Sequence, residues 1–519
     1  MKRLLMLFFS IVFLFGFVSE NNTKEIGKEL GVEILSQEKI DSLCLGKEFV
    51  RFEEPITYEG YIIGYDEGQN MLLLPQNLNK NFFHGVLNCP KEKLVFLEDD
   101  SWSNKQEAIS SNQVFRLFRI GEEKYWMYNV YFTGMPIANL KTDYISEKNE
   151  NYGEMWVYDP YSDHSRYQIG KCKFGLRGAS SLTFPKPSYK IAFTEEDISL
   201  LGMRKDDDWI LNSLYDDEGL IHNKVSYDLW KQIAASNQVD NDEGTSMEYI
   251  EVFVDNTYMG VYGLLERIDK KTFNLNEKDI LYKGVDKVIG EGDFYLQLTE
   301  DMKPAFKIKY PEIFSKEHWE PLKEWVYSFE EKESKESEQS EQLEKTLNLE
   351  NAIDYSLYLS FISGGDNNIK NTYYFADYQQ DGTYRIIKVP WDLNMTWGNG
   401  WYENHKYHFN LYQEKYIDNI WEWAEDVFLL YQRNPGEVGN KLQMRWKELR
   451  KNIITEENIY KMLDKQFNYI HSSGAYLRNC MFWGDRKEYW SDHYIYDYTY
   501  KKIKAMDEYM EQLTVTEGI

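Results

Sequence analysis

Apolar and polar residues follow two different periods along this chain. From Gln113 onward, runs of β-branched and aromatic residues predict a sheet, and the alternation over residues 171–177 predicts a strand with one solvated face. Residues 401–510 are helical in pattern and rich in aromatic residues. Residues 216–234 predict a helix capped by Asp216 or Asp217, because apolar residues recur every four positions: Ile221, Val225, Leu229 and Ile233. Together these periods predict a mixed α+β protein.

Two pairs of short strand-like runs are each separated by a turn signal, so each pair predicts a β-hairpin. A hairpin returns the chain to the end that it left, so the second hairpin should place Asn371 beside Asp392. The runs and their turns are 249–254 and 258–266 around Asp255-Asn256, and 371–376 and 384–389 around Asp381-Gly382.

Asp366, Asn371 and Asp392 are the strongest candidates for catalysis. Asn371 and Asp392 carry the oxygen donors that a hard divalent cation takes, and Asp366 lies one loop away, where it can orient a hydroxyl group. Protein kinases use a base, a metal-binding Asn and a metal-binding Asp in this way for phosphoryl transfer. A structural alternative stays open, because Asp and Asn favour turns and helix caps in any protein.

A glycine-rich loop with a fixed positive charge comes earlier in the chain. Residues 175–181 have the sequence GLRGASS after a predicted strand, so backbone N–H groups and Arg177 can approach a phosphate. The following strand, residues 185–193, puts its apolar side chains on one face and Lys190 on the other. A lysine there can reach under the loop to a nucleotide. Taken singly these are ordinary turn and surface residues, and Arg177 fits a structural ion pair equally well, so the order of the motifs carries the prediction.

Several longer motifs occur in a fixed order: RGASS with PKPSYKI, then LLGMRKDDDWILNSLYDDEGLIHNK, MGVYGLLERID, and DNNIKNTYYF with VPWDLNMTWG. In these motifs the chain resembles the spore-coat protein H (CotH) kinase family. The resemblance covers residues 112–400 and continues more loosely toward residue 510. It implies an atypical protein-kinase-like fold with a β-rich nucleotide lobe and a helical C-terminal lobe. It also implies transfer of phosphate from ATP, with Mg²⁺ or Mn²⁺, to Ser or Thr of secreted, surface or spore-coat proteins.

The resemblance gives each matching residue a role. Lys190 corresponds to the lysine that contacts the nucleotide phosphates, with Lys186 as the second choice. Asp366 corresponds to the base that orients the acceptor hydroxyl, and Asn371 and Asp392 correspond to the metal ligands. The other expected nucleotide contacts are Arg177, Gly178, Ser180 and Ser181 in the loop, with Glu266 and Ile268 near the adenine.

Two positions depart from the family pattern. Asn394 stands where many relatives have a second Asp, and His222 stands where relatives often have Arg. Lower charge at the metal site would weaken catalysis, so the main alternative is an inactive binding or coat-assembly protein with the same fold. A surface carbohydrate-binding protein is a further alternative, suggested by the 16% of residues that are aromatic.

Charge and the first residues of the chain bear on partners and location. The net charge of −27 argues against nucleic acid and suits a basic, Ser-rich protein substrate, although solubility alone explains it equally well. Lys2-Arg3 precede an apolar run from residue 4 to 18, which predicts a signal peptide over residues 1–19. We therefore expect export to the extracellular space, the cell surface or the spore coat. An uncleaved N-terminal membrane anchor is the alternative.

The length of 519 residues exceeds what one compact core usually holds, so we expect more than one unit. Residues 20–111 carry no motif and form an accessory region of unknown role, and residues 112–515 form the CotH-like domain. Within that domain, residues 330–345 are a Glu/Lys/Ser run that predicts a charged insertion. The four Cys residues lack the spacing of a zinc site.

Overall fold

A computed structural model describes most of the chain. The predicted signal peptide lies outside the described residues, as do residues 330–344 of the expected insertion. No helix within the described ranges is long and apolar enough to cross a membrane. Those ranges are 31–58, 61–62, 64–76, 87–88, 91–99, 105–146, 150–162, 167–285, 305–328, 345–399, 425–484 and 493–513.

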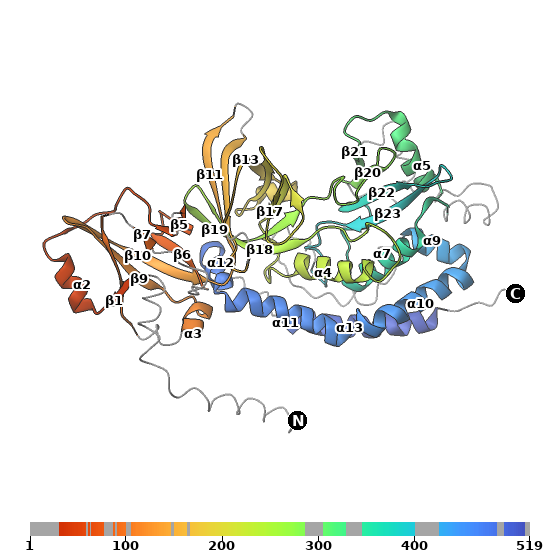
Figure 1. Ribbon diagram of the computed structural model, residues 1–519. Helices are drawn as coiled ribbons and strands as arrows, with labels where there is room; N and C mark the ends of the chain where they lie inside the picture. Colours follow the sequence, from red (N-terminus) through yellow and green to blue (C-terminus); the bar gives the residue numbers. More distant parts are fainter. Residues whose placement is uncertain are drawn as a thin grey trace, which may run out of the picture.

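The N-terminal part forms a seven-stranded sheet with the strand order β1-β8-β9-β10-β6-β5, to which β2 adds beside β10 (Figure 1). The hairpin of β9 and β10 completes this sheet, because β9 pairs with β8 and β10 pairs with β6. The sheet therefore continues to Thr133, past the boundary expected at residue 112. Its elements are β1 Glu33–Leu35, α2 Gln37–Cys44, β2 Glu48–Phe49, β5 Gly64–Asp66, β6 Met71–Pro75, β8 Lys93–Leu97, α3 Lys105–Ser110, β9 Phe115–Ile120 and β10 Lys124–Thr133, beside a small sheet of β3 Thr57–Tyr58, β4 Tyr61–Ile62 and β7 Leu87–Asn88.

A closed barrel follows, with the order β11-β12-β13-β14-β17-β19-β18, and the parallel pairing of β18 with β11 closes it. Its interior is the apolar cluster that contains Phe174 and Ile191, on the faces predicted from the alternation in these strands. The first predicted hairpin is confirmed as β18–β19, and its turn residues Asp255 and Asn256 both have positive φ, as a two-residue type I′ turn requires. The elements are β11 Ile137–Ile145, β12 Asn151–Tyr158, β13 Tyr167–Arg177, η2 Ser180–Thr183, β14 Ser188–Phe193, β17 Asp208–Asn212, β18 Met247–Val254 and β19 Thr257–Glu266, with β15 Ile198–Ser199 and β16 Lys205–Asp206 as a separate pair.

The second predicted hairpin is also confirmed. It is β22–β23, and it forms one side of a four-stranded sheet with the order β21-β20-β22-β23. The pairing of Thr372 with Pro390 brings the two ends of the hairpin together. The sheet consists of β20 Ile280–Gly284, β21 Phe306–Tyr310, β22 Thr372–Tyr378 and β23 Tyr384–Pro390, and η3 Lys316–Trp319 and α5 Glu320–Tyr327 follow β21 in the chain.

The helix expected from residue 216 begins later, as α4 at His222–Ala234. Leu214 and Leu220 have φ of +50° and +57°, and a right-handed helix cannot pass through such residues. Residues 214–221 are therefore a loop. Asp217 still serves the helix, because its Oδ2 accepts a hydrogen bond from the backbone N–H of His222 at 2.8 Å. The side chain of its neighbour Asp216 binds a different segment of the chain.

Helices dominate the last part of the chain, as the sequence predicts. Helices α10, α11 and α13 run along one side of the molecule below α4 and α7 (Figure 1), and α12 packs on β19 of the barrel. Within the range 401–510 that was predicted to be helical, residues 401–424 and 485–492 lie outside the described residues. The helices are α7 Leu349–Ile362, α9 Glu425–Arg433, α10 Pro435–Asn452, α11 Glu456–Ser472, α12 Ala475–Trp483 and α13 His493–Gln512.

Candidate active site

A cleft of about 310 Å³ lies between the barrel and the four-stranded sheet. Strands β13, β14 and β17 form one wall, and β20, β21 and β22 contribute to the other. Trp391, which follows β23, is part of the lining. The volume falls at the lower end of the range for small-molecule sites. The cleft therefore joins residues that the sequence separates by more than two hundred positions.

The lining of this cleft is basic, although the chain as a whole has a net charge of −27. Lys190 and Arg267 are paired with acids of the same lining, at 3.2 Å from Glu150 and 2.5 Å from Asp208. The other basic side chains form no ion pair with a described residue. A positive concavity in an acidic protein favours a polyanionic ligand. The basic residues of the lining are Lys173, Arg177, Lys190, Arg267, Lys283 and Lys309.

The hairpin brings the predicted metal ligands together at the edge of this cleft. The N–H of Trp391 donates to the carbonyl oxygen of Asn371 at 2.9 Å, which fixes the start of one strand against the end of the other. The amide of Asn367 spans the same two residues, donating to both of their carbonyl oxygens. Asn371 and Asp392 have φ of +61° and +59°, a conformation that Asn and Asp tolerate better than most residues. The need for a residue that tolerates positive φ is one reason why Asn and Asp occur at positions 371 and 392.

Asp366 is held against Asn371. Its Oδ2 accepts hydrogen bonds from Asn371 Nδ2 at 2.8 Å and from Lys370 Nζ at 3.0 Å. Because the amide nitrogen of Asn371 faces Asp366, the amide oxygen points the other way, and it accepts no hydrogen bond from the described part of the chain. Asp366 and Asn371 are therefore in direct contact, with Lys370 beside them, and Asp392 follows Trp391, whose N–H binds Asn371.

Asp392 is a partly buried carboxylate without a partner among the described side chains. Helix α4 positions its backbone, since the N–H of Asp392 donates to Tyr227 Oη at 3.0 Å and the N–H of Leu393 donates to Asn223 Oδ1 at 2.8 Å. Burial and the negative charge of Asp392 raise the pKa of Tyr227, which keeps that hydroxyl protonated. An ionised carboxylate left without hydrogen bonds in a partly buried place is costly unless a cation joins it.

Lys283 on β20 is a cleft residue that the sequence did not indicate. Its ammonium lies 5.2 Å from the ring centre of Tyr373 and 5.5 Å from that of Trp391. Burial lowers the pKa of Lys283 to about 8; Asp392 opposes this fall, and Arg177 and nearby basic side chains add to it. Lys283 is thus close enough to Asp392 to feel its charge, whereas the pairing partner of Lys190 is Glu150.

Three of the expected nucleotide contacts lie elsewhere. Lys186 is buried under α12, where Nζ donates to Val261 O at 2.5 Å and to Asn479 Oδ1 at 2.9 Å. Burial lowers the pKa of Lys186 well below its usual value. Glu266 accepts backbone N–H bonds from Arg204 and Ser246, and Ile268 is in the main apolar core. These placements give each residue a structural part and leave it out of the cleft lining.

The glycine loop approaches the cleft through Arg177. Gly178 has φ of +132°, and a Cβ there would come within 1.9 Å of Ser181 Oγ, so only glycine fits. The loop then turns into η2, which begins at Ser180, and neither Gly178 nor Ser181 is part of the cleft lining. Of the loop residues whose side chains the structure describes beyond Gly175, Arg177 is the one that lines this cleft.

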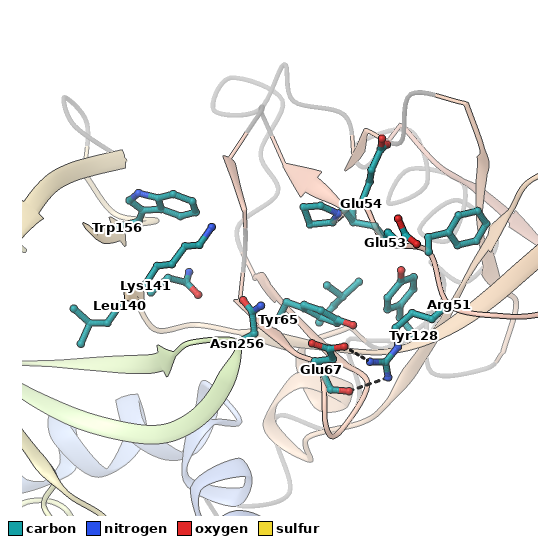
Figure 2. A pocket seen from close by; sticks show the side chains of 15 residues that line it. Arg51, Glu53, Glu54, Tyr65, Glu67, Tyr128, Leu140, Lys141, Trp156 and Asn256 are labelled. Atoms are coloured by element: carbon teal, nitrogen blue, oxygen red, sulfur yellow. Dashed lines mark hydrogen bonds and ion pairs between the residues drawn. The ribbon is translucent and has the colours of Figure 1, made fainter. Parts of the chain in front are cut away.

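A second cleft, of about 390 Å³, lies between the N-terminal sheet and the barrel (Figure 2). An ion pair of 2.9 Å joins Arg51 to Glu67 on one side, and Lys141 and Trp156 come from the barrel on the other (Figure 2). It contains none of the residues predicted to act in catalysis. The basic cleft is therefore the candidate active site.

The model of the CotH kinase protein family matches residues 174–513, which is well over half of the chain. The chain belongs to the CotH kinase family. No curated protein matches it. The matched range begins within β13 of the barrel and includes Asp366, Asn371 and Asp392.

Membership of the CotH kinase family implies, as for kinases in general, the use of ATP and a divalent metal. Among the described residues no three His, Cys, Asp or Glu side chains gather around one point. The side-chain oxygens of Asp392 and Asn371 are nevertheless hard donors that accept no hydrogen bond from a described residue, and they fit Mg²⁺ or Mn²⁺, which also take phosphate oxygens and water. The residues present therefore fit the metal that the family implies.

The two departures from the CotH pattern have different surroundings. His222 is buried, with Nδ1 at 2.7 Å from Asp217 Oδ1 and Nε2 bonded to Tyr494 Oη, so it ties the start of α4 to α13. Asn394 is buried two residues after Asp392, and its Nδ2 donates to Asp216 Oδ2 at 2.5 Å. The His222 change is accommodated structurally, whereas the Asn394 change alters the charge near Asp392.

Proposed function

We propose that this protein is an extracytoplasmic protein kinase that transfers the γ-phosphate of ATP to Ser or Thr of secreted, surface or spore-coat proteins. One observation carries the proposal: Trp391, which lines the basic cleft, is bonded through its N–H to Asn371 and directly precedes Asp392, and Asn371 in turn binds Asp366. The cations would bind the phosphates of the nucleotide, and the adjacent oxygen donors would hold the metal. A kinase-like arrangement of two lobes follows from this reading, with the barrel as the nucleotide lobe. Export rests on the predicted signal peptide alone.

In this proposal each group of the chain has a limited task. Arg177 and Lys283 hold and orient phosphate oxygens, and Asp392 and Asn371 fix the metal, which when bound neutralises charge on the transferring phosphate. Asp366, kept in place by Lys370 and Asn371, orients the acceptor hydroxyl and accepts its proton. Positioning and charge neutralisation are most of what phosphoryl transfer needs.

The direct test is transfer of label from ATP. The purified chain without residues 1–19 should label itself or a basic Ser-rich peptide when it is incubated with γ-labelled ATP and Mg²⁺ or Mn²⁺. Chelation of the metal should stop the labelling. Absence of transfer to a broad set of Ser and Thr peptides with either metal would contradict the proposal.

An inactive binding protein with the same fold is a second candidate, and Asn394 is the observation that favours it. Binding and transfer separate the two candidates. A ligand at 100 times its dissociation constant should stabilise the protein by about 2.7 kcal/mol, which is visible as a rise in melting temperature. A clear shift with ATP and metal but no transfer would support the inactive candidate, and no shift at millimolar ATP would exclude a nucleotide role for the cleft.

We predict that the affinity for ATP falls as the pH rises above about 8, because the pKa of Lys283 is lowered to about 8. Below that pH the free protein holds Lys283 charged. Above it, binding of phosphate must also bring a proton to Lys283, so the dissociation constant should rise by up to about tenfold per pH unit. Titration of ATP binding from pH 7 to pH 9.5 measures this.

The Lys283→Arg variant is the matched control, since arginine stays charged throughout this range. Its affinity for ATP should be nearly independent of pH. Lys190→Arg should keep the wild-type pH dependence, because Lys190 is exposed and paired with Glu150. If Lys190→Arg removed the pH dependence instead, Lys190 would be the lysine that contacts the phosphates.

We further predict that a basic acceptor peptide is phosphorylated faster than an acidic one, and that NaCl reduces its rate. The three consecutive acids Asp206, Asp207 and Asp208 would suggest an acidic groove, but each is paired within the protein. Lys271 and Arg204 bind Asp206, Lys271 also binds Asp207, and Arg267 binds Asp208. Attraction must therefore come from the net charge of −27. Salt screens such attraction over about 8 Å at physiological ionic strength.

Rates for basic and acidic Ser peptides, measured between low and high salt at saturating ATP, decide this point. The ATP dissociation constant should change less than the peptide rate over the same series. Equal rates for both peptides at low salt would show that the negative charge serves solubility and not substrate capture.

A further inference from the structure

Asp216 lies beside the site although its position in the sequence suggested only a helix cap. It and Asp217 are neighbours in the loop before α4, but they face different partners. Asp217 binds the first residue of α4, and Asp216 binds the amide of Asn394, two residues after Asp392. The loop thus brings one further carboxylate to the segment that carries the principal candidate metal ligand.

Two carboxylates without a cation are unfavourable in such a place. Asp216 and Asp392 are both only partly exposed, and neither forms an ion pair with a described Lys or Arg side chain. The carboxylate of Asp392 is close enough to Asp216 for the two negative charges to repel each other. Like charges held together in this way are characteristic of a site that a cation completes.

Because residue 394 is Asn and not Asp, a second carboxylate near Asp392 has to come from a segment outside the hairpin. An Asn at this position lacks the charge of an Asp, and its Nδ2 is held by Asp216 at 2.5 Å. The carbonyl oxygen of Asn394 accepts from Asn399 Nδ2 at 2.8 Å, which fixes this segment further. The amide of Asn394 and the carboxylate of Asp216 are therefore adjacent, so a carboxylate at either position would lie near Asp392.

We propose that Asp216 supplies the second carboxylate of the divalent-metal site and so replaces the charge that Asn394 lacks. The inference rests on the proposed function, because it assigns a ligand to the metal which that function requires. The ligand class is a hard divalent cation, Mg²⁺ or Mn²⁺, bound through oxygen.

Binding of Mn²⁺ alone, without nucleotide, tests the inference without relying on activity. Free Mn²⁺ is measured by electron paramagnetic resonance while the protein is titrated at pH 8. Asp216→Asn should weaken binding by about 10- to 100-fold, the usual result of losing a group that supports a metal site. The surface change Asp240→Asn, with the same loss of charge on an exposed turn, should leave affinity unchanged. Without metal, Asp216→Asn should melt no lower than wild type, since it removes like-charge repulsion.

The double change Asp216→Asn with Asn394→Asp returns the charge to the hairpin and should restore most of the affinity. Loss of affinity that this exchange fails to restore would overturn the inference, because Asp216 would then act only by holding Asn394. Equal Mn²⁺ affinity of Asp216→Asn and wild type, with loss in Asp392→Asn, would overturn the inference and leave the proposed function intact. A wild-type chain that binds no Mn²⁺ would overturn the metal site itself, and with it both proposals.

Discussion

Replacing Asp392 by alanine should reduce phosphate transfer by about a thousandfold or more. A directly bound metal contributes several kcal/mol of stabilisation to the transition state, and each 1.4 kcal/mol corresponds to about a factor of ten in rate. In the described part of the chain no other side chain offers an unpaired carboxylate at the same place, and Asp216, which lies against Asn394, would supply only the second ligand. Transfer of label from ATP to a basic Ser peptide at saturating Mn²⁺ measures the loss.

A control must separate lost chemistry from lost folding, because Asp392 has φ of +59° and alanine is strained there. Asp392→Asn keeps a residue that tolerates this conformation and removes only the charge. Asp381→Ala changes an exposed Asp at the far turn of the same hairpin and should retain activity. Transfer at the wild-type rate by a folded Asp392→Asn or Asp392→Ala protein would show that the metal ligand lies elsewhere.

Local patterns predicted the parts of the site that depend on contacts near in sequence. The turn at Asp381-Gly382 and the alternating strands around it fixed the hairpin, and the hairpin placed Asn371 beside Trp391, the residue before Asp392. The same reasoning placed Lys190 on the solvated face of β14. These predictions are confirmed as geometry, because strand period and turn chemistry depend on a few adjacent residues.

Contacts between segments distant in sequence could not be predicted from these local patterns. Lys283 and Lys309 reach the cleft from β20 and β21, whose place opposite the barrel depends on the packing of the whole chain. Glu266 and Ile268 were predicted to contact the nucleotide. Arg267, which lies between them, is the residue that lines the cleft. Neighbours in extended chain point to opposite sides, so a shift of one position exchanges every side chain.

Lys186 shows why residue type alone misleads. A lysine just before a strand is normally solvated, yet this one is buried because a carbonyl, an amide oxygen and the ring of Tyr262 surround its ammonium. Helix α12, which supplies Asn479, follows it by almost three hundred residues. The start of α4 was missed for a different reason, since Leu220 has a positive φ although it is not a glycine.

Replacing Arg478 by leucine should lower the free energy of unfolding by about 3–5 kcal/mol, the usual result of removing one partner from a buried ion pair. Arg478 on α12 is almost fully buried, and it binds both oxygens of Glu251 at 2.9 and 2.8 Å. It also donates to Asn112 Oδ1 and to the carbonyl of Phe132, so one side chain joins the N-terminal sheet, the barrel and the C-terminal helices. Leucine would leave Glu251 charged and buried without its partner.

Unfolding in urea, followed by fluorescence and by circular dichroism, measures this effect. Lys441→Leu provides the comparison, because the pair of Lys441 with Glu437 is exposed on α10 and should contribute about 0.3–0.5 kcal/mol. The double change Arg478→Leu with Glu251→Leu should recover part of the loss, since no buried charge then remains. A loss below about 1 kcal/mol for Arg478→Leu alone would contradict the burial of this pair.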